Sequence, residues 1–193
     1  MKTKHSITFK QLIMALGGIC SALFIAQSAR AASPAGDVVG KVTVGYQGWF
    51  GAIGDGSPQN VWWHWSANWA QAPSPNNNSI KAWPDVTGYT TTYQTAYASL
   101  NNGNPAKLFS SYDQSTVNAQ FQWMQQNSID TAALQRFNPA GEANRDGMAT
   151  KVRTAAETYG VKFFIMYDIT GWETMDTDLK TDWNNLLEKM KAK

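Results

Sequence analysis

Aromatic side chains are concentrated in two neighbouring segments of the sequence. Residues 46–51 read YQGWFG and residues 61–65 read VWWHW. Sugars stack their C–H faces on indole and phenol rings, and Gln and His side chains beside such rings can bond hydroxyl groups. A single Trp more often belongs to a hydrophobic core, but the whole set, within a polar stretch, favours a sugar-binding surface. Its predicted members are Tyr46, Gln47, Trp49, Trp63, His64 and Trp65.

Two aspartates are the candidates for acid–base chemistry. Glycoside cleavage usually needs a pair of carboxylates, one as acid and one as nucleophile or base. Asp113 ends the segment FSSYD and Asp168 ends MYD, each directly after a predicted strand. In a parallel barrel the carboxyl ends of the strands carry the active site. A helix N-cap ahead of Ser115 explains Asp113 equally well.

Further polar and aromatic side chains stand at the same strand ends or in the loop before them. Arg136 closes the third predicted strand, where it could pair with a carboxylate of the site, orient a sugar hydroxyl or form a purely structural salt bridge. The remaining predicted substrate-binding residues are Asp85, Tyr112, Gln135, Arg136 and Tyr167.

The residue types argue against several other chemistries. Cys20 is the single cysteine and lies in the N-terminal apolar run, and His64 is the only histidine after His5. Neither a thiol nucleophile nor a zinc site built from His and Cys is therefore expected. The G-x-S-x-G and phosphate-loop motifs do not occur either. We expect no metal and no cofactor.

The first 31 residues have the pattern of a signal peptide. Basic residues precede an apolar run from Leu12 to Ala26, and residues 29–31 (ARA) form a small-x-small cleavage site. An uncleaved N-terminal anchor is the alternative. We expect a secreted or periplasmic protein, with a signal over residues 1–31 and one domain over residues 32–193.

The distribution of charge bears on the partners of this domain. All charged residues before Ala32 are basic, whereas the whole chain has 16 basic and 14 acidic residues. The mature part is thus slightly acidic and has no cluster of Lys or Arg. We expect neither a nucleic-acid partner nor membrane binding after signal cleavage.

Hydrophobic patterns predict strands that alternate with helices. The strands are expected at Val38–Tyr46, Lys107–Tyr112, Thr131–Phe137 and Lys162–Tyr167. Continuous apolar runs such as KFFIMY suit parallel strands that are covered on both faces. The connection from Gly48 to Pro105 is long, polar and rich in Trp, which predicts an ordered functional loop.

Three apolar stripes at helical spacing follow the later strands. They are Val117, Phe121 and Met124; Met148, Val152, Ala155 and Tyr159; and Leu179, Trp183, Leu186 and Met190. Ser115 is expected to cap the first of these helices, and Asp176 or Thr177 the last. The pattern predicts an α/β fold, a partial TIM-barrel-like domain of about four β/α units with a long aromatic loop after the first strand. A chain of 193 residues falls short of the about 250 of a full barrel.

A series of short motifs is spaced along the chain from Val44 to Trp172. The motifs are GYQGWFG (residues 45–51), WHW (63–65), WPD (83–85), LFSSYD (108–113), FQWM (121–124), LQRF (134–137) and MYD (166–168). Together they resemble bacterial proteins of the glycoside hydrolase family 71/99-like group, which includes endo-acting α-mannosidases and α-glucanases. The resemblance implies a (β/α)8 barrel that cleaves α-glycosidic bonds without a redox cofactor. It also implies that Tyr46, Trp63, His64 and Trp65 lie near the substrate.

The chain departs from this family at the catalytic carboxylates, which lie late in the barrel in an N-E-W-x-E-like segment that does not occur here. The resemblance therefore implies a glycoside hydrolase-like protein that acts on or binds α-linked oligosaccharide or polysaccharide, in a truncated form without those carboxylates. Whether this chain is itself an enzyme stays open. The alternatives are a secreted, non-catalytic carbohydrate-binding protein and a soluble α/β domain whose Trp residues are only core.

Overall fold

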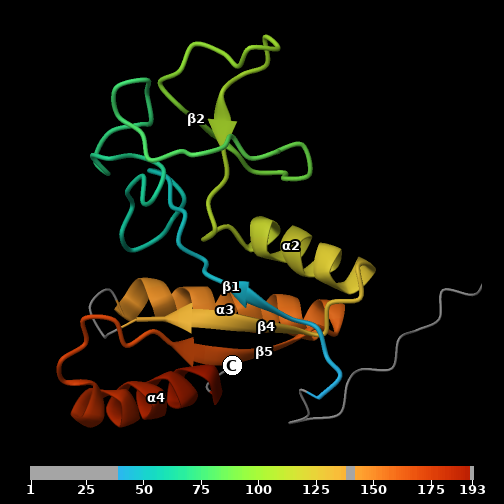
Figure 1. Ribbon diagram of the computed structural model, residues 1–193, viewed down its shortest axis with the longest axis vertical. Coiled ribbons are helices and arrows are strands. Elements are labelled where there is room, and N and C mark those ends of the chain that lie inside the picture. The colour runs from blue at the N-terminus through green and yellow to red at the C-terminus, as the bar shows by residue number, and fades with distance from the viewer. Residues whose placement is uncertain (1–38, 138–141, 192–193) are drawn as a thin grey trace, which may run out of the picture. The chain divides into compact units, whose positions relative to one another are not determined.

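The computed structural model describes residues 39–137 and 142–191 and contains a parallel sheet of three strands (Figure 1). The strands β1 (Thr43–Tyr46), β4 (Thr131–Arg136) and β5 (Lys162–Tyr167) are ordered β1-β4-β5. Both neighbouring pairs are parallel. Their carboxyl ends therefore meet at one edge of the sheet. The predicted signal, residues 1–31, lies outside the described residues.

Each strand of this sheet is followed along the chain by a helix. The helices are α2 (Gln114–Gln126), α3 (Glu142–Tyr159) and α4 (Met175–Lys191). The alternation confirms a mixed α/β fold with a parallel sheet. Within residues 39–137 and 142–191 the sheet does not close into a barrel.

The second predicted strand does not belong to the parallel sheet. In the segment Lys107–Tyr112 only β3 (Lys107–Leu108) is extended, and it pairs antiparallel with β2 (Tyr93–Gln94). The parallel sheet thus contains three β/α units in the described chain, and the prediction of a parallel strand here is wrong. The apolar run led to a wrong prediction because Leu108 and Phe109 are buried in the core of the long loop and not in the parallel sheet.

The main core lies between the sheet and the helices. Side chains from β1, β4 and β5 that share a face, among them Tyr46, Leu134 and Ile165, pack against α2 and α3. The first two predicted helical stripes are confirmed, since Val117, Phe121, Met124, Met148, Val152 and Ala155 are buried and Tyr159 packs against them. Tyr46 meets Phe121 edge-on, with ring centroids 5.5 Å apart.

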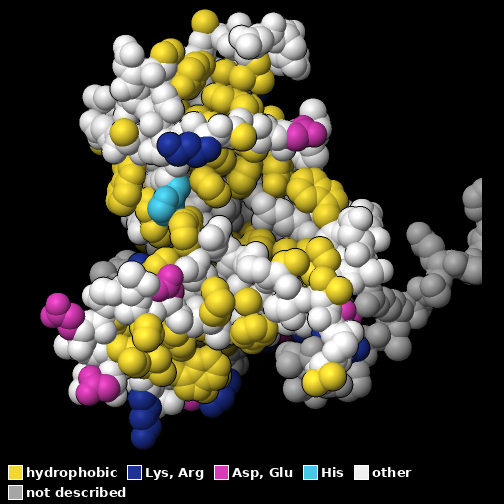
Figure 2. All heavy atoms as spheres, viewed as in Figure 1, with side chains coloured by type: hydrophobic (Ala, Val, Ile, Leu, Met, Phe, Trp, Pro, Cys, Tyr) yellow, Lys and Arg dark blue, Asp and Glu magenta, His cyan; other side chains and the backbone are white. Residues whose placement is uncertain are grey.

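The opposite face of β5 is open to solvent in the described part of the chain. Phe164 and Met166 are 42% and 39% exposed, whereas Phe163 and Ile165 pack toward the core. The expectation that KFFIMY is covered on both faces is therefore wrong. All three helices described here pack into the one core that lies against the other face. Hydrophobic side chains gather on the molecular surface as a result (Figure 2).

The predicted ends of two helices shift by one or a few residues. Asp113 occupies the N-cap position of α2, although its carboxylate makes no capping bond. Helix α4 begins at Met175, because the Thr174 carbonyl accepts the N–H groups of Thr177 and Asp178. In α4 the buried positions are Asp182 and Leu186, whereas Trp183 is 39% exposed. The predicted stripe of the last helix is thus only partly correct.

The long loop after β1 is ordered and has a core of its own. Trp62 and Trp65 are buried there with Ala52, Leu108 and Phe109. The Trp65 indole N–H donates to the carbonyl of Phe109 over 2.9 Å, and its ring stacks on Phe50 with a centroid distance of 4.0 Å. The Asp55 carboxylate accepts hydrogen bonds from the Ala52 N–H and the Ser110 hydroxyl. The hydrophobic core of the loop is therefore separate from that of the parallel sheet.

Candidate functional site

A row of partly exposed rings lies beyond the carboxyl ends of β1 and β4. The row, here called the ring surface, consists of Trp49, Trp63, His64, Trp69 and Phe137. His64 contacts Trp49 and Trp63 at centroid distances of 4.7 and 5.0 Å, and Trp63 meets Trp69 at 6.3 Å. Trp49 reaches Phe137 at 5.5 Å. Figure 2 shows the histidine at the molecular surface with hydrophobic side chains beside it.

The six residues of the aromatic prediction separate in the structure. Trp49, Trp63 and His64 join the ring surface, and Gln47 is exposed beside them. Trp65 and Tyr46 are only 4% and 7% exposed and belong to the two separate cores. The Tyr46 hydroxyl donates to Gln120 Oε1 over 2.5 Å, and burial raises its pKa far above the usual value. Because both rings are buried, they are not part of the exposed ring surface.

His64 is held in an unusual backbone conformation. Its φ of 60° lies in the left-handed region, which costs a non-glycine residue about 1–2 kcal/mol. Burial lowers the pKa of its imidazole, so the ring is neutral at pH 7. The turn places this neutral ring between Trp49 and Trp63. Such local strain is typical of sites whose geometry the surrounding fold determines.

Asp168 lies at the carboxyl end of β5 and is tied to its neighbours. Gln135 Nε2 donates to Asp168 Oδ2 over 2.7 Å, and the backbone N–H of Thr170 donates to Oδ1 over 2.9 Å. The hydrogen bonds from Thr170, and then the one from Gln135, lower the pKa of this carboxyl. Asp168 is thus a hydrogen-bond acceptor at neutral pH, and Gln135 and Asp168 form one polar pair at the strand ends.

Asp113 lies elsewhere, at the start of α2. Its Oδ1 accepts the Tyr93 hydroxyl over 3.0 Å, while its buried Oδ2 has no hydrogen-bond partner. Burial raises the pKa of this carboxyl, and the charge of Asp55 adds to the rise, against the lowering effects of Tyr93 and Lys151. In the described chain, neither Asp113 nor Asp168 lines the cavity beside Trp49 and Arg136 or the hollow along β1 and α2. The two candidate carboxylates thus bond to different partners, Tyr93 and Gln135, and neither of these two cavities brings them together.

Asp113→Asn is expected to raise the free energy of unfolding at pH 7 by at most about 1 kcal/mol, because it removes the charge of a half-buried carboxylate yet keeps an acceptor for Tyr93, and solvent screening reduces the gain. A carboxyl whose pKa is raised on folding loses stability as the pH rises through the folded pKa. The gain should therefore vanish in acid, below the pKa of the unfolded chain. Urea titrations at several pH values measure it.

The matched control is Asp85→Asn. Asp85 is exposed in the loop, and the Thr87 backbone N–H and hydroxyl lower its pKa. That variant should gain no stability at pH 7. Equal gains for both variants would contradict the assigned burial of Asp113.

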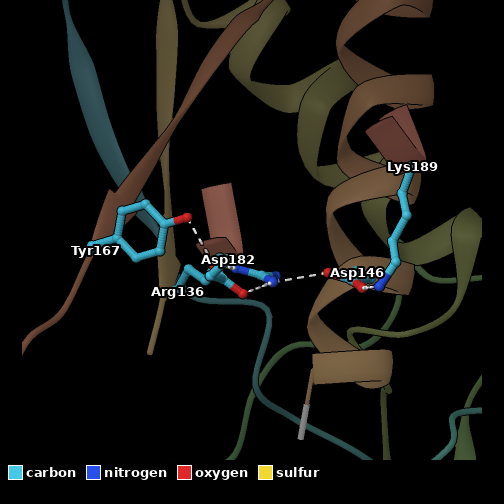
Figure 3. Close-up of polar contacts among 5 residues, drawn as sticks. All are labelled: Arg136, Asp146, Tyr167, Asp182 and Lys189. Atoms are coloured by element: carbon cyan, nitrogen blue, oxygen red, sulfur yellow. Dashed lines mark hydrogen bonds and ion pairs between the residues drawn. The ribbon is translucent and has the colours of Figure 1, made fainter. Parts of the chain in front are cut away.

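Arg136 and Tyr167 face the helices and take part in a buried ionic network (Figure 3). Arg136 Nε and Nη2 donate to the two oxygens of Asp182, each over 2.6 Å, and Nη2 also reaches Asp146 Oδ1 over 2.9 Å. The Tyr167 hydroxyl donates to Asp182 Oδ2 over 2.8 Å. Lys189 bonds the other oxygen of Asp146 over 2.6 Å. Of the roles considered for Arg136, the structure shows the salt bridge.

The network determines the ionisation of its members. Burial alone would lower the pKa of Arg136, but the hydrogen bonds and charges of Asp182 and Asp146 outweigh it and raise the pKa. Burial alone would raise the pKa of Asp182, but the bonds from Arg136 and Tyr167 lower it. Both groups are therefore ionised at neutral pH, and they connect β4, β5, α3 and α4.

Tyr112, also predicted to bind substrate, lies under α3. Its ring is covered by the Lys151 ammonium at 4.6 Å from the centroid. A Cβ on Gly147 would lie 2.0 Å from the Tyr112 hydroxyl, so only glycine allows this approach. Tyr112 thus packs against α3, and it lines a small cavity together with Trp49 and Trp63 of the ring surface.

Two cavities differ in size and chemistry. One of about 20 Å³ lies beside Gln47, Trp49, Trp63, Arg136 and Asn144 and is partly open to solvent. The other, a hollow of about 400 Å³, lies along β1 and α2. Its lining includes Gln120, which is already bonded by Tyr46 and Tyr89, and is otherwise largely apolar.

Several site residues were not predicted from the sequence. Trp69 and Phe137 complete the ring surface, and Asn144 and Arg145 of α3 line the small cavity. The Arg145 guanidinium lies 5.5 Å from the Phe137 ring centroid. The Trp-rich segment and the LQRF motif contained a signal for the first two. Nothing in the sequence distinguishes Asn144 or Arg145 from ordinary helix residues.

Comparison of the sequence with protein-family models and with curated proteins gives no match, so the site is interpreted from its geometry. Over the described residues, no three or more His, Cys, Asp or Glu side chains form a group that could hold a metal ion. No helix in the same part of the chain is long and apolar enough to span a membrane.

Proposed function

We propose that this chain binds α-linked oligosaccharide or polysaccharide on the ring surface. The supporting observation is the contiguous series of partly exposed rings from Phe137 through Trp49, His64 and Trp63 to Trp69. Flat apolar rings with polar edges suit the C–H faces and hydroxyl groups of a sugar. The motif resemblance to glycoside hydrolases of the 71/99-like group supplies the α-linked class.

The strand–helix repeat supports a place for the site within a (β/α) barrel architecture. In such barrels the binding face lies at the carboxyl ends of the strands. The ring surface and the pair of Gln135 and Asp168 both lie at those ends. We propose that the three units β1–α2, β4–α3 and β5–α4 are the first units of a barrel of this kind.

Binding without cleavage is favoured over hydrolysis. Glycosidases place two carboxyl groups about 5–9.5 Å apart on either side of the scissile bond. Asp168 is bonded to Gln135 and Thr170, whereas Asp113 is bonded to Tyr93 and lies against the loop. Of the two candidate carboxylates, only Asp168 thus lies at the strand ends, where its partner Gln135 lines a cavity with Trp49 and Trp63.

Trp63→Ala is expected to weaken binding of α-1,3-glucan and α-mannan oligosaccharides at least about fivefold, because a stacked ring contributes about 1 kcal/mol beyond its buried area. Isothermal titration calorimetry of the secreted protein measures this, and reducing-sugar release measures turnover. The matched control is Trp123→Ala, an equally large ring on α2 that is 39% exposed and packs on Tyr89.

Three results would each count against the proposal. They are absence of glycan binding by the unaltered protein, an equal loss in the Trp123 control, and sustained release of reducing sugar. The last would show that the chain is a hydrolase in its own right.

A further inference from the structure

Three buried polar atoms without hydrogen-bond partners belong to residues that line the small cavity of about 20 Å³. They are Trp49 Nε1, Arg136 Nη1 and Asn144 Oδ1. Arg136 is 2% exposed and Asn144 is 6% exposed. A buried polar group without a partner costs about 1–3 kcal/mol, and such groups are rare in folded proteins. Three residues with such atoms around one cavity indicate a place for a ligand atom.

The three atoms come from three elements and are held firmly. Arg136, at the end of β4, has its other two nitrogens fixed by Asp182 and Asp146, so only Nη1 remains to be satisfied. Trp49, after β1, is held by contacts with His64 and Phe137. Asn144 lies on the first turn of α3. The cavity walls are thus preorganised.

The chemistry of these atoms identifies the group that fits. Two are N–H donors and one is an acceptor, so the complementary group must both accept and donate a hydrogen bond. Two carboxylates already neutralise Arg136, which removes the electrostatic demand for an anion. A volume of about 20 Å³ admits one oxygen-sized group. A single hydroxyl meets all three conditions.

The position of the cavity connects this group to the sugar site. Trp49 and Trp63 line it and also belong to the ring surface, and the cavity is partly open to solvent. We propose that one hydroxyl of a sugar stacked on the ring surface enters this cavity. There it accepts from Trp49 Nε1 and Arg136 Nη1 and donates to Asn144 Oδ1. This inference rests on the proposed function and makes the cavity its specificity subsite.

The test compares glycosides that lack one hydroxyl. Methyl α-mannopyranoside, methyl α-glucopyranoside and their monodeoxy analogues are titrated into the full chain by NMR. Removal of one particular hydroxyl should weaken binding roughly tenfold, because it leaves the three cavity groups unpartnered. Trp49→Phe and Asn144→Leu should bind the parent glycoside about tenfold more weakly and should no longer discriminate against that deoxy analogue.

Trp69→Phe is the matched control, because it makes the same change on a ring of the same surface away from the cavity. It should keep the deoxy penalty. If the parent glycoside binds and Trp63→Ala weakens it, yet no deoxy analogue differs, the cavity holds water only and this inference fails while the proposed function stands. Tighter binding of a uronic acid glycoside through Trp49 and Asn144 would show an anion site and overturn it too. If no glycoside binds the unaltered protein, both proposals fail.

Discussion

Asp182→Ala is expected to lower the free energy of unfolding by about 3–5 kcal/mol. The change leaves the Arg136 guanidinium buried without its two-pronged partner and removes the acceptor of the Tyr167 hydroxyl. A domain of this size is stable by about 5–15 kcal/mol, so such a loss takes a large share of its stability. Thermal and urea unfolding followed by circular dichroism measure it.

The same carboxylate, that of Asp182, makes the free energy of unfolding depend on pH. Because the pKa of Asp182 is lowered on folding, its contribution is complete above the pKa of the unfolded chain. That contribution is lost as the pH falls through the lower, folded pKa. The difference in stability between the unaltered protein and Asp182→Ala should therefore shrink in strong acid.

Two further variants separate the loss of a buried partner from a general effect of charge removal. Glu157→Ala breaks the exposed pair with Arg153 on α3 and should cost no more than about 0.5 kcal/mol. The double variant Arg136→Met with Asp182→Leu removes both charges and should recover much of the stability, since no charge stays buried alone. A loss below 1 kcal/mol in Asp182→Ala would contradict the buried hydrogen bonds described between Asp182, Arg136 and Tyr167.

Trp65→Ala is expected to cost about 3–5 kcal/mol, the range for removing a buried aromatic side chain. The ring is 4% exposed, stacks on Phe50 and donates its N–H to the Phe109 carbonyl. Its loss leaves a cavity at the centre of the loop core. Because the loop core and the sheet core are separate clusters, we expect the loop to open before the sheet.

Hydrogen exchange of the loop and sheet amides measures that order directly. Trp69→Ala is the control, since Trp69 is 48% exposed and belongs to the ring surface. It should change stability by no more than about 0.5 kcal/mol. Equal protection of the loop amides in Trp65→Ala and in the unaltered protein would contradict the assignment of Trp65 as the centre of the loop core.

Local pattern was enough to predict much of the α/β framework. Continuous apolar residues predicted β4 and β5, and helical spacing predicted the buried faces of α2 and α3. These features depend on neighbours within a few residues, which periodicity reports. The segment Lys107–Tyr112 failed because an apolar run shows that residues are buried but not which core buries them.

The candidate site could be predicted only as a region. Trp63 and Trp65 are two residues apart and chemically identical, yet one lies on the ring surface and the other in the loop core. The difference arises from the turn at His64, with its positive φ, and from the distant partner Phe109. Sequence spacing holds no information on such a contact.

The amino-acid sequence alone was enough to predict β4, β5, the buried faces of α2 and α3, and the concentration of rings after the first strand. The tertiary structure alone decided which rings stay exposed, that Arg136 pairs with Asp182 from a helix 46 residues further on, and that Asn144 joins Trp49 at one cavity. The physical reason is the separation along the chain between the residues that interact. Secondary structure follows from interactions between near neighbours, whereas burial and pairing depend on which distant segments the folded chain brings together.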